Sequence, residues 1–195
     1  MPGSLHTKRL FADSLKDLMR TKSLEEISVG DIATHCEMSR NAFYYHFQDK
    51  FDLVNWVFRT ESAAYFAQEI NRENWSSVLH SFYDYFRENR VFYCNALAYT
   101  GQNSLQDYLF ETVQDILVQH IHGLRKPEYR NWTEKEIGFA ADFFATAIVG
   151  MLARWARQGM VSDEQNYNDC LRVILSGSMI EDFLGSQQNT FPARG

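Results

Sequence analysis

Hydrophobic residues recur every three or four positions along most of the chain, which predicts amphipathic helices rather than strands. The first helix is expected over residues 5–22. Its apolar stripe consists of Phe11, Leu15, Leu18 and Met19. Ser28 and Ser39 are good N-cap residues, so each is expected to begin a short helix. The first of these covers residues 29–36 and the second takes about two turns after Ser39.

Longer helices are predicted for the remainder of the chain. Asp49 is expected to cap a helix from residue 50 to about residue 70. Thr133 and Glu136 form a capping box that begins a helix over residues 134–158. The other predicted helices cover residues 75–90, 91–99, 105–124 and 163–185. The pattern predicts an all-α fold of about nine helices, with a three-helix domain at residues 1–48 and a larger bundle at residues 49–195.

Composition agrees with a packed helical protein. Hydrophobic residues make up 45% of the chain and aromatic residues 15%, which is ample for a core. Only 10 Gly and 3 Pro are present, so turn signals are few. The three cysteines are widely separated, which is typical of buried thiols in a reducing compartment. Without a signal peptide or an apolar run of membrane length, a cytoplasmic protein is expected.

The short helix after Ser39 has one apolar face and one polar face. Phe43 and Phe47 share a face and are expected to point into the core. Asn41 and Tyr45 point the opposite way. The flanks carry Arg40, Ala42, Tyr44 and His46. A helix of this kind can enter a DNA major groove, so we interpret it as the recognition helix of a helix-turn-helix.

The same region resembles the tetracycline-repressor (TetR/AcrR) family over roughly residues 8–55. The resemblance rests on Ile27-Ser28-Val29, Asp31-Ile32-Ala33, Ser39-Arg40, Phe43-Tyr44-Tyr45-His46-Phe47, Lys50 and Leu53. It implies an all-α, homodimeric transcription factor with a variable ligand-binding C-terminal domain. More loosely, three C-terminal segments are similar to regulators related to the dihydroxyacetone kinase operon activator. They are Asn89-Arg90-Val91-Phe92-Tyr93, Gly101-Gln102-Asn103-Ser104 and Gly150 to Met160.

The resemblance also implies roles for individual residues. Tyr44, His46 and Lys50 would hold DNA phosphates. The residues facing base edges would be Arg40, Asn41, Ala42 and Tyr45. The alternative for all seven is an ordinary solvated helix face.

Two positions depart from the family pattern. Glu37 stands where the family has Gly in the turn, so a positive φ is expected there. Gly30 stands where the second helix of the family usually carries a polar or basic side chain. Because glycine has no side chain, this position offers no side-chain contact to the DNA backbone.

The charge balance gives no indication of nucleic-acid binding. The formal net charge is −6, and residues 1–52 contain seven Lys or Arg against eight Asp or Glu. Any affinity for DNA must therefore come from a local arrangement of cations.

Aromatic residues are dense in the C-terminal domain and have two interpretations. They either form plain core or line an apolar cavity for a ligand. The candidate ligand-binding residues are Phe82, Phe86, Phe92, Tyr93, Tyr99 and Phe143. His120 and His122 diverge on a helix and make a poor metal pair, so no metal site or cofactor is expected.

In the family that the chain resembles, the last two helices, at residues 134–158 and 163–185, form the dimer interface. Small residues along the first of them permit close packing, which an internal core explains equally well. They are Gly138, Ala141, Ala145 and Ala156. Dimerisation would place two recognition helices on half-sites one DNA turn apart, roughly 34–36 Å.

The sequence therefore predicts a regulator that binds a pseudo-palindromic operator as a homodimer and responds to a small-molecule effector. In the alternative, the C-terminal domain binds a coregulator protein and no small molecule. A helical-bundle enzyme ranks third, because the chain carries no convergent metal ligands, Gly-rich phosphate loop or nucleophile motif. We therefore expect no enzymatic activity.

Overall fold

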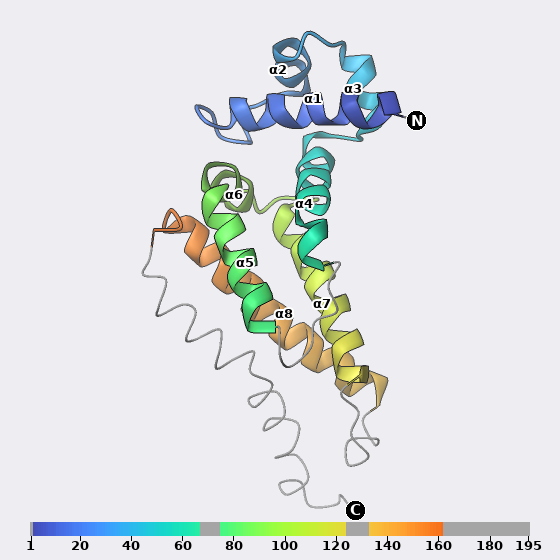
Figure 1. Ribbon diagram of the computed structural model, residues 1–195, viewed down its shortest axis with the longest axis vertical. Coiled ribbons are helices and arrows are strands. Elements are labelled where there is room, and N and C mark those ends of the chain that lie inside the picture. Colours follow the sequence, from blue (N-terminus) through green and yellow to red (C-terminus); the bar gives the residue numbers. More distant parts are fainter. Residues whose placement is uncertain (1, 67–74, 124–132, 162–195) are drawn as a thin grey trace, which may run out of the picture.

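The computed structural model describes residues 2–66, 75–123 and 133–161, and these ranges form eight α-helices and no strand (Figure 1). The helices are α1 (Pro2–Leu18), α2 (Val29–His35), α3 (Arg40–His46), α4 (Lys50–Phe66), α5 (Trp75–Glu88), α6 (Arg90–Ala98), α7 (Leu105–Gly123) and α8 (Glu134–Arg157). The prediction of an all-α fold is confirmed. The helix predicted over residues 163–185 lies outside the described residues.

Helices α1, α2 and α3 lie together at one end of the molecule, and α4 leads away from them (Figure 1). Phe11 of α1 is completely buried, and its ring centroid lies 5.2 Å from that of Phe43 and 6.4 Å from that of Phe47. The Ser14 hydroxyl donates to the Ile32 carbonyl at 2.8 Å. Helix α1 therefore fixes both α2 and α3 through its buried side.

Side-chain caps determine where the short helices begin. The Ser28 hydroxyl accepts from the Asp31 N–H at 3.1 Å, and the Asp31 carboxylate accepts from the Ser28 N–H at 2.8 Å. Ser39 Oγ accepts from the Ala42 N–H at 3.1 Å. Asp49 accepts N–H hydrogen bonds in the first turn of α4. These caps satisfy amide groups that have no partner inside the helix, and the three predicted N-caps are confirmed.

The C-terminal helices pack around a core rich in aromatic rings. Phe58 of α4, Phe86 of α5 and Tyr93 of α6 are almost completely buried. The Phe86 and Tyr93 centroids are 4.3 Å apart, and Phe58 lies 6.1 Å from Phe86. Phe11 of α1 belongs to the same continuous core cluster. The N-terminal helices are thus joined to the C-terminal bundle by packed side chains.

Helix α8 packs against α7 through its small residues. Ala141 and Ala145 are completely buried and pack with Leu117 of α7. Ala156 is also buried. Internal packing therefore accounts for these alanines. By length and composition alone α8 could cross a membrane, but a core helix of a soluble protein passes the same test.

The predicted ends of α8 are confirmed. Thr133 and Glu136 form the capping box. At the other end Gly159 has φ of 75°, its N–H donates to the Ala156 carbonyl, and the Met160 N–H donates to the Trp155 carbonyl. This is a Schellman motif, in which glycine supplies the left-handed residue after the helix.

Candidate nucleic-acid interface

Helix α3 has one polar face exposed to solvent and an opposite face buried in the core. Phe43 is completely buried and Phe47 is 3% exposed, as the sequence predicts. Tyr45 on the opposite side is 84% exposed and Tyr44 is 57% exposed. Arg40 and Asn41 are exposed, whereas Ala42 and His46 are half-buried. A rigid helix with this division can contact base edges without disturbing its own core.

Ring contacts hold the two exposed tyrosines at defined angles. Tyr44 meets Phe43 edge-on at 5.7 Å between centroids. Tyr45 meets His46 edge-on at 4.9 Å. Edge-to-face contacts of this kind modestly stabilise these orientations of the two exposed rings.

The turn before α3 has the strained geometry expected from the sequence. Glu37 has φ of 56°, and its N–H donates to the Thr34 carbonyl at 3.1 Å. The Met38 N–H donates to the Ala33 carbonyl at 2.8 Å. The same Schellman pattern that ends α8 with glycine therefore ends α2 with glutamate.

Arg40 lies across the N-terminal turn of α2. A Cβ atom added to Gly30 would lie 2.3 Å from one Arg40 guanidinium nitrogen and 2.8 Å from the guanidinium carbon. The absence of a side chain at position 30 thus makes room for the guanidinium. The Ser28 hydrogen bonds, and to a smaller degree the charge of Arg40, hold the pKa of Asp31 below its ordinary value.

Lys50 is placed differently from the family-based expectation. Its ammonium donates to the carbonyls of Leu24 at 2.7 Å, Glu25 at 2.9 Å and Ile27 at 2.7 Å. An ammonium has three N–H donors, so all of them are occupied by the connection between α1 and α2. Burial lowers the pKa of Lys50, and nearby carboxylates oppose that shift. These contacts favour a structural role for Lys50 over a phosphate contact.

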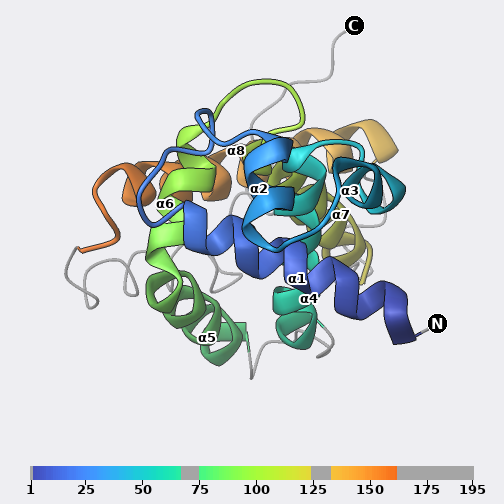
Figure 2. The ribbon, with the colours of Figure 1, turned by 90° about the horizontal axis from the view of Figure 1, so that it is seen from above.

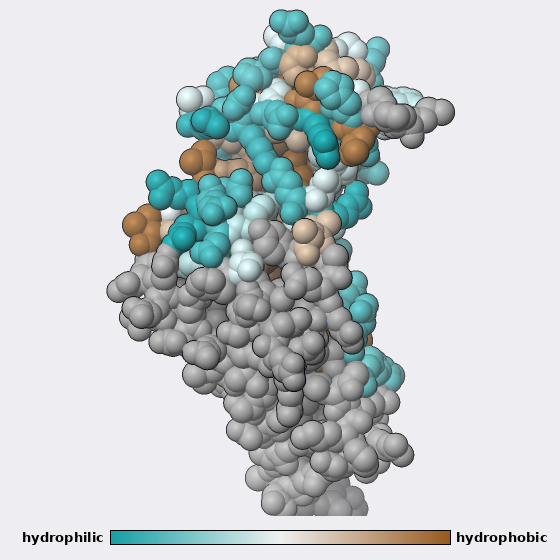
Figure 3. Space-filling view, viewed as in Figure 1, coloured by the Kyte–Doolittle hydropathy of each residue, from teal (hydrophilic) through white to brown (hydrophobic). Residues whose placement is uncertain are grey.

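The surface of the α1–α3 end mixes hydrophilic residues with scattered hydrophobic ones (Figure 3). Lys8 of α1 is one nearby cation, and its ammonium lies 5.2 Å from the Phe47 ring centroid and 5.9 Å from that of Trp56. In such contacts the ammonium is attracted to the electron-rich face of the aromatic ring. Lys8 thus places one cation against aromatic rings beside α3.

All the candidate ligand-binding residues except Phe143 belong to or pack against one hydrophobic core cluster, but they lie at different places in it. Phe82, Phe86 and Tyr93 belong to the ring cluster around Phe58. Phe92 is buried beside α1, with the Lys16 ammonium 5.6 Å from its ring centroid. The other two lie elsewhere.

Tyr99 stacks on Phe51 of α4, with centroids 4.1 Å apart and rings 11° from parallel. Its ring also fills the space beside Gly101. Phe143 is 55% exposed on α8, and Phe139 one turn earlier is 67% exposed. Sequence periodicity identified the aromatic residues, but it could not separate those of the ring cluster from those of α8.

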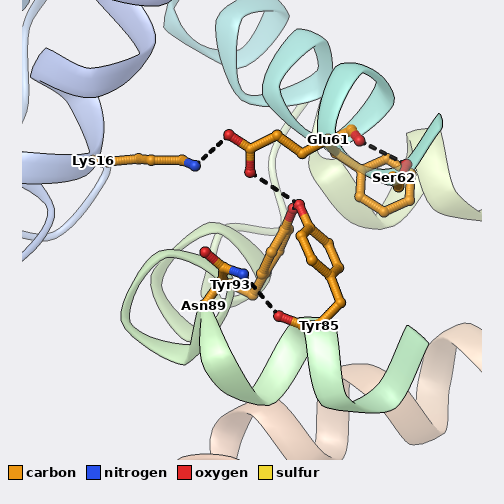
Figure 4. Close-up of polar contacts among 7 residues, drawn as sticks. Lys16, Glu61, Ser62, Tyr85, Asn89 and Tyr93 are labelled. Atoms are coloured by element: carbon orange, nitrogen blue, oxygen red, sulfur yellow. Dashed lines mark hydrogen bonds and ion pairs between the residues drawn. The ribbon is translucent and has the colours of Figure 1, made fainter. Parts of the chain in front are cut away.

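A polar chain links the ring cluster to the N-terminal helices (Figure 4). The Tyr85 and Tyr93 hydroxyls contact each other, and the Tyr85 hydroxyl donates to Glu61 at 3.0 Å. Glu61 in turn forms an ion pair with Lys16 of α1. These four residues thus form one continuous chain of polar contacts that runs from α6 through α5 and α4 to α1.

Asn95 is a second link that sequence reasoning missed. Its side chain, on α6, forms hydrogen bonds with backbone groups of Met19, Lys22 and Leu24. The only available signal was an amide between the apolar residues Cys94 and Ala96. That signal cannot name a partner more than 70 residues away.

Comparison with known proteins covers both halves of the chain. Residues 13–57 match the family described as bacterial regulatory proteins, tetR family. Residues 73–177 match the family described as transcriptional regulator C-terminal region. The second match alone spans more than half of the chain.

Individual relatives agree with these matches. The chain is 24% identical over 176 residues to the HTH-type dhaKLM operon transcriptional activator DhaS of Lactococcus lactis subsp. lactis (strain IL1403), covering 90% of this chain and 92% of that protein. A solved structure of the dihydroxyacetone kinase operon activator DhaS is similar, with a TM-score of 0.57, 22% identity, and coverage of 96% and 98%.

A second solved structure is NalD, the secondary repressor of the MexAB-OprM multidrug efflux pump in Pseudomonas aeruginosa. It has a TM-score of 0.53 and 18% identity, and it covers 87% of this chain and 94% of its own. At these identities the structures support the fold alone. Together with the helix-turn-helix geometry of α2 and α3, the family matches show that this chain belongs to the tetR family of bacterial regulatory proteins.

Proposed function

We propose that the protein is a cytoplasmic transcriptional regulator that binds a pseudo-palindromic operator as a homodimer and has no enzymatic activity. The observation that carries this proposal is the exposed polar face of α3 above the buried Phe43 and Phe47. Arg40, Asn41, Ala42 and Tyr45 read base edges, and Tyr44 and His46 contact phosphates. Lys50 contributes indirectly, because its hydrogen bonds hold the α1–α2 connection that precedes the helix-turn-helix.

Binding of operator variants tests the assignment of α3. The operator is first selected from random DNA duplexes with the wild-type protein. Arg40→Ala and Tyr45→Ala should each lower affinity for this operator by roughly tenfold while leaving affinity for unrelated DNA nearly unchanged. Fluorescence anisotropy titrations measure both affinities.

Arg59→Ala is the matched control, because Arg59 is also exposed but lies farther along α4. It should bind like the wild type. Equal losses on operator and unrelated DNA for Tyr45→Ala would contradict a base-reading role.

The proposal includes a small-molecule effector that acts through the C-terminal domain. The chain from Tyr93 through Tyr85 and Glu61 to Lys16 supports it, because it joins the ring cluster to α1. A ligand that favours one arrangement of α4 and α6 would shift operator affinity by population shift. A ligand screen that reads operator affinity tests this, and a uniformly flat result would oppose it.

In the second proposal the C-terminal domain binds a coregulator protein instead. The contacts among Phe58, Phe82, Phe86 and Tyr93 support it, because rings that pack on one another have the character of plain core. A coregulator would raise the mass of the protein–operator complex in solution, whereas a small effector would not. Mass measurement of complexes assembled with and without cell extract, followed by identification of any added protein, separates the two proposals.

A further inference from the structure

Asn95 of α6 binds the backbone that connects α1 to α2. Its Oδ1 accepts from the Leu24 N–H at 2.7 Å. Its Nδ2 donates to the Lys22 carbonyl at 2.7 Å and to the Met19 carbonyl at 3.3 Å. We infer that Asn95 is a positioning residue for DNA binding, which sets the placement of the helix-turn-helix on the C-terminal domain. This inference rests on the proposed operator binding.

These contacts engage almost all of the hydrogen-bonding capacity of the Asn95 carboxamide. An asparagine side chain offers two N–H donors and one oxygen acceptor, and both N–H groups and the oxygen are engaged here. A carboxamide and a peptide group carry the same kinds of donor and acceptor. Because hydrogen bonds depend on distance and angle, three of them restrain the position and orientation of the connection relative to α6. A hydrophobic side chain at position 95 would leave these three backbone groups without this partner.

Lys50 also holds this connection. The Lys50 ammonium bonds the carbonyls of Leu24, Glu25 and Ile27, while Asn95 bonds the preceding turn and the Leu24 N–H. Ser28, the N-cap of α2, follows immediately. Together with the packing of α1, the position of this connection therefore sets where α2 begins and, through the short turn at Glu37, where α3 lies.

Other residues of α6 show why this helix can act as the positioning element. Phe92 lies one turn before Asn95 and is buried beside Lys16 of α1. Tyr93 instead packs into the ring cluster with Phe58 and Phe86. The end of α1 lies close to α6 in both ribbon views (Figures 1 and 2). Helix α6 therefore contacts α1, the connection that leads into the helix-turn-helix, and the C-terminal core.

The test uses full-length protein and the operator duplex selected with the wild type. Asn95→Ala removes all three hydrogen bonds. Asn95→Asp is nearly isosteric and keeps the acceptor for Leu24 but removes both N–H donors. Asn89→Ala is the matched control, because the Asn89 amide donates to the Tyr85 carbonyl at 2.9 Å and so stays within the C-terminal domain.

Operator affinity is measured on duplexes whose half-site spacing is native or is changed by one base pair. Both Asn95 variants should keep the helical circular dichroism of the wild type and lose about tenfold in affinity for the native spacing. Their preference for native over altered spacing should shrink, because the placement of the two α3 helices is less fixed. Asn89→Ala should keep the wild-type spacing preference.

A purely structural role would lower the melting temperature and leave the spacing preference intact. That result for both Asn95 variants would overturn the inference while operator binding itself stands. Failure of the wild-type protein to select any duplex would instead refute the proposed function. Should Asn95→Ala fail to fold, Asn95→Asp alone decides between these outcomes.

Discussion

Glu37 occupies a backbone position that glycine adopts at much lower cost. Its φ of 56° lies in the left-handed region, where a side chain costs about 1–2 kcal/mol. The two Schellman hydrogen bonds at the end of α2 hold it there. The strain lies one residue before Met38 and two before Ser39, so it is stored at the turn that orients α3.

Glu37→Gly should therefore stabilise the protein by about 0.5–1 kcal/mol, since the relief of strain exceeds the larger unfolded-state entropy of glycine. Thermal melting should rise by about 1–4 °C for a chain of this size. Gly159→Ala makes the reverse change at the matching position of α8, where φ is 75°, and should lower the melting temperature by a similar amount. A fall in stability for Glu37→Gly would mean that the glutamate side chain contributes contacts that outweigh the strain.

At the scale of the element, local chemistry explains the ends of the described helices well. Ser28, Ser39, Asp49 and Thr133 cap helices as predicted, because a cap depends only on residues within the next turn. The capping box that Asp31 completes at the start of α2 followed from the same rule but was not predicted. It also makes the stability of α2 depend on pH.

Hydrogen bonds from the Ser28 side chain and backbone lower the pKa of Asp31 below its ordinary value, which is roughly 3.9. A lowered folded-state pKa means that the stabilisation is complete above the unfolded value and is lost as pH falls through the folded value. Asp31→Asn should therefore reduce the acid sensitivity of thermal melting below about pH 4 and change little of its slope near neutrality. Melting curves between pH 3 and pH 7 measure this difference.

Asp13→Asn is the comparison variant for this measurement, because Asp13 is an exposed carboxylate on α1. It should retain the wild-type dependence on pH. Identical profiles for wild type and Asp31→Asn would show that the capping box contributes nothing measurable to folding.

At the scale of the whole molecule, long-range contacts mark the limit of what the sequence could predict. Helix positions and the inward phenylalanines of α3 followed from periodicity. The three carbonyl partners of Lys50 lie 23 to 26 residues away, and Leu24 lies 71 residues from Asn95. No local pattern specifies such pairs, because they form only when separate helices are brought together. The resemblance to a family therefore gave Lys50 a phosphate role, whereas its contacts favour an internal one.

The prediction about dimerisation concerns the exposed face of helix α8. Phe139 and Phe143 lie one turn apart and are exposed in the described part of the chain, and nothing lies within 4 Å of a Cβ added to Gly150. If this face joins two protomers, replacing both phenylalanines with serine should weaken dimerisation by at least about a hundredfold, since each buried ring contributes about 1.5–3 kcal/mol. Sedimentation velocity at micromolar concentration measures the shift to monomer.

Val161→Ser is the control for that experiment, because Val161 is 74% exposed just beyond the end of α8. It should sediment as the wild type does. A double phenylalanine variant that remains dimeric would place the contact between protomers on other helices.

The hydrogen bonds of the Lys50 ammonium within the protein have a consequence for binding to DNA outside the operator. With that cation engaged by carbonyls, about one counterion fewer should be displaced from arbitrary duplex than if Lys50 bound a phosphate, and the overall excess of acidic groups should weaken such binding further. Little of the protein should then be sequestered on the rest of the chromosome.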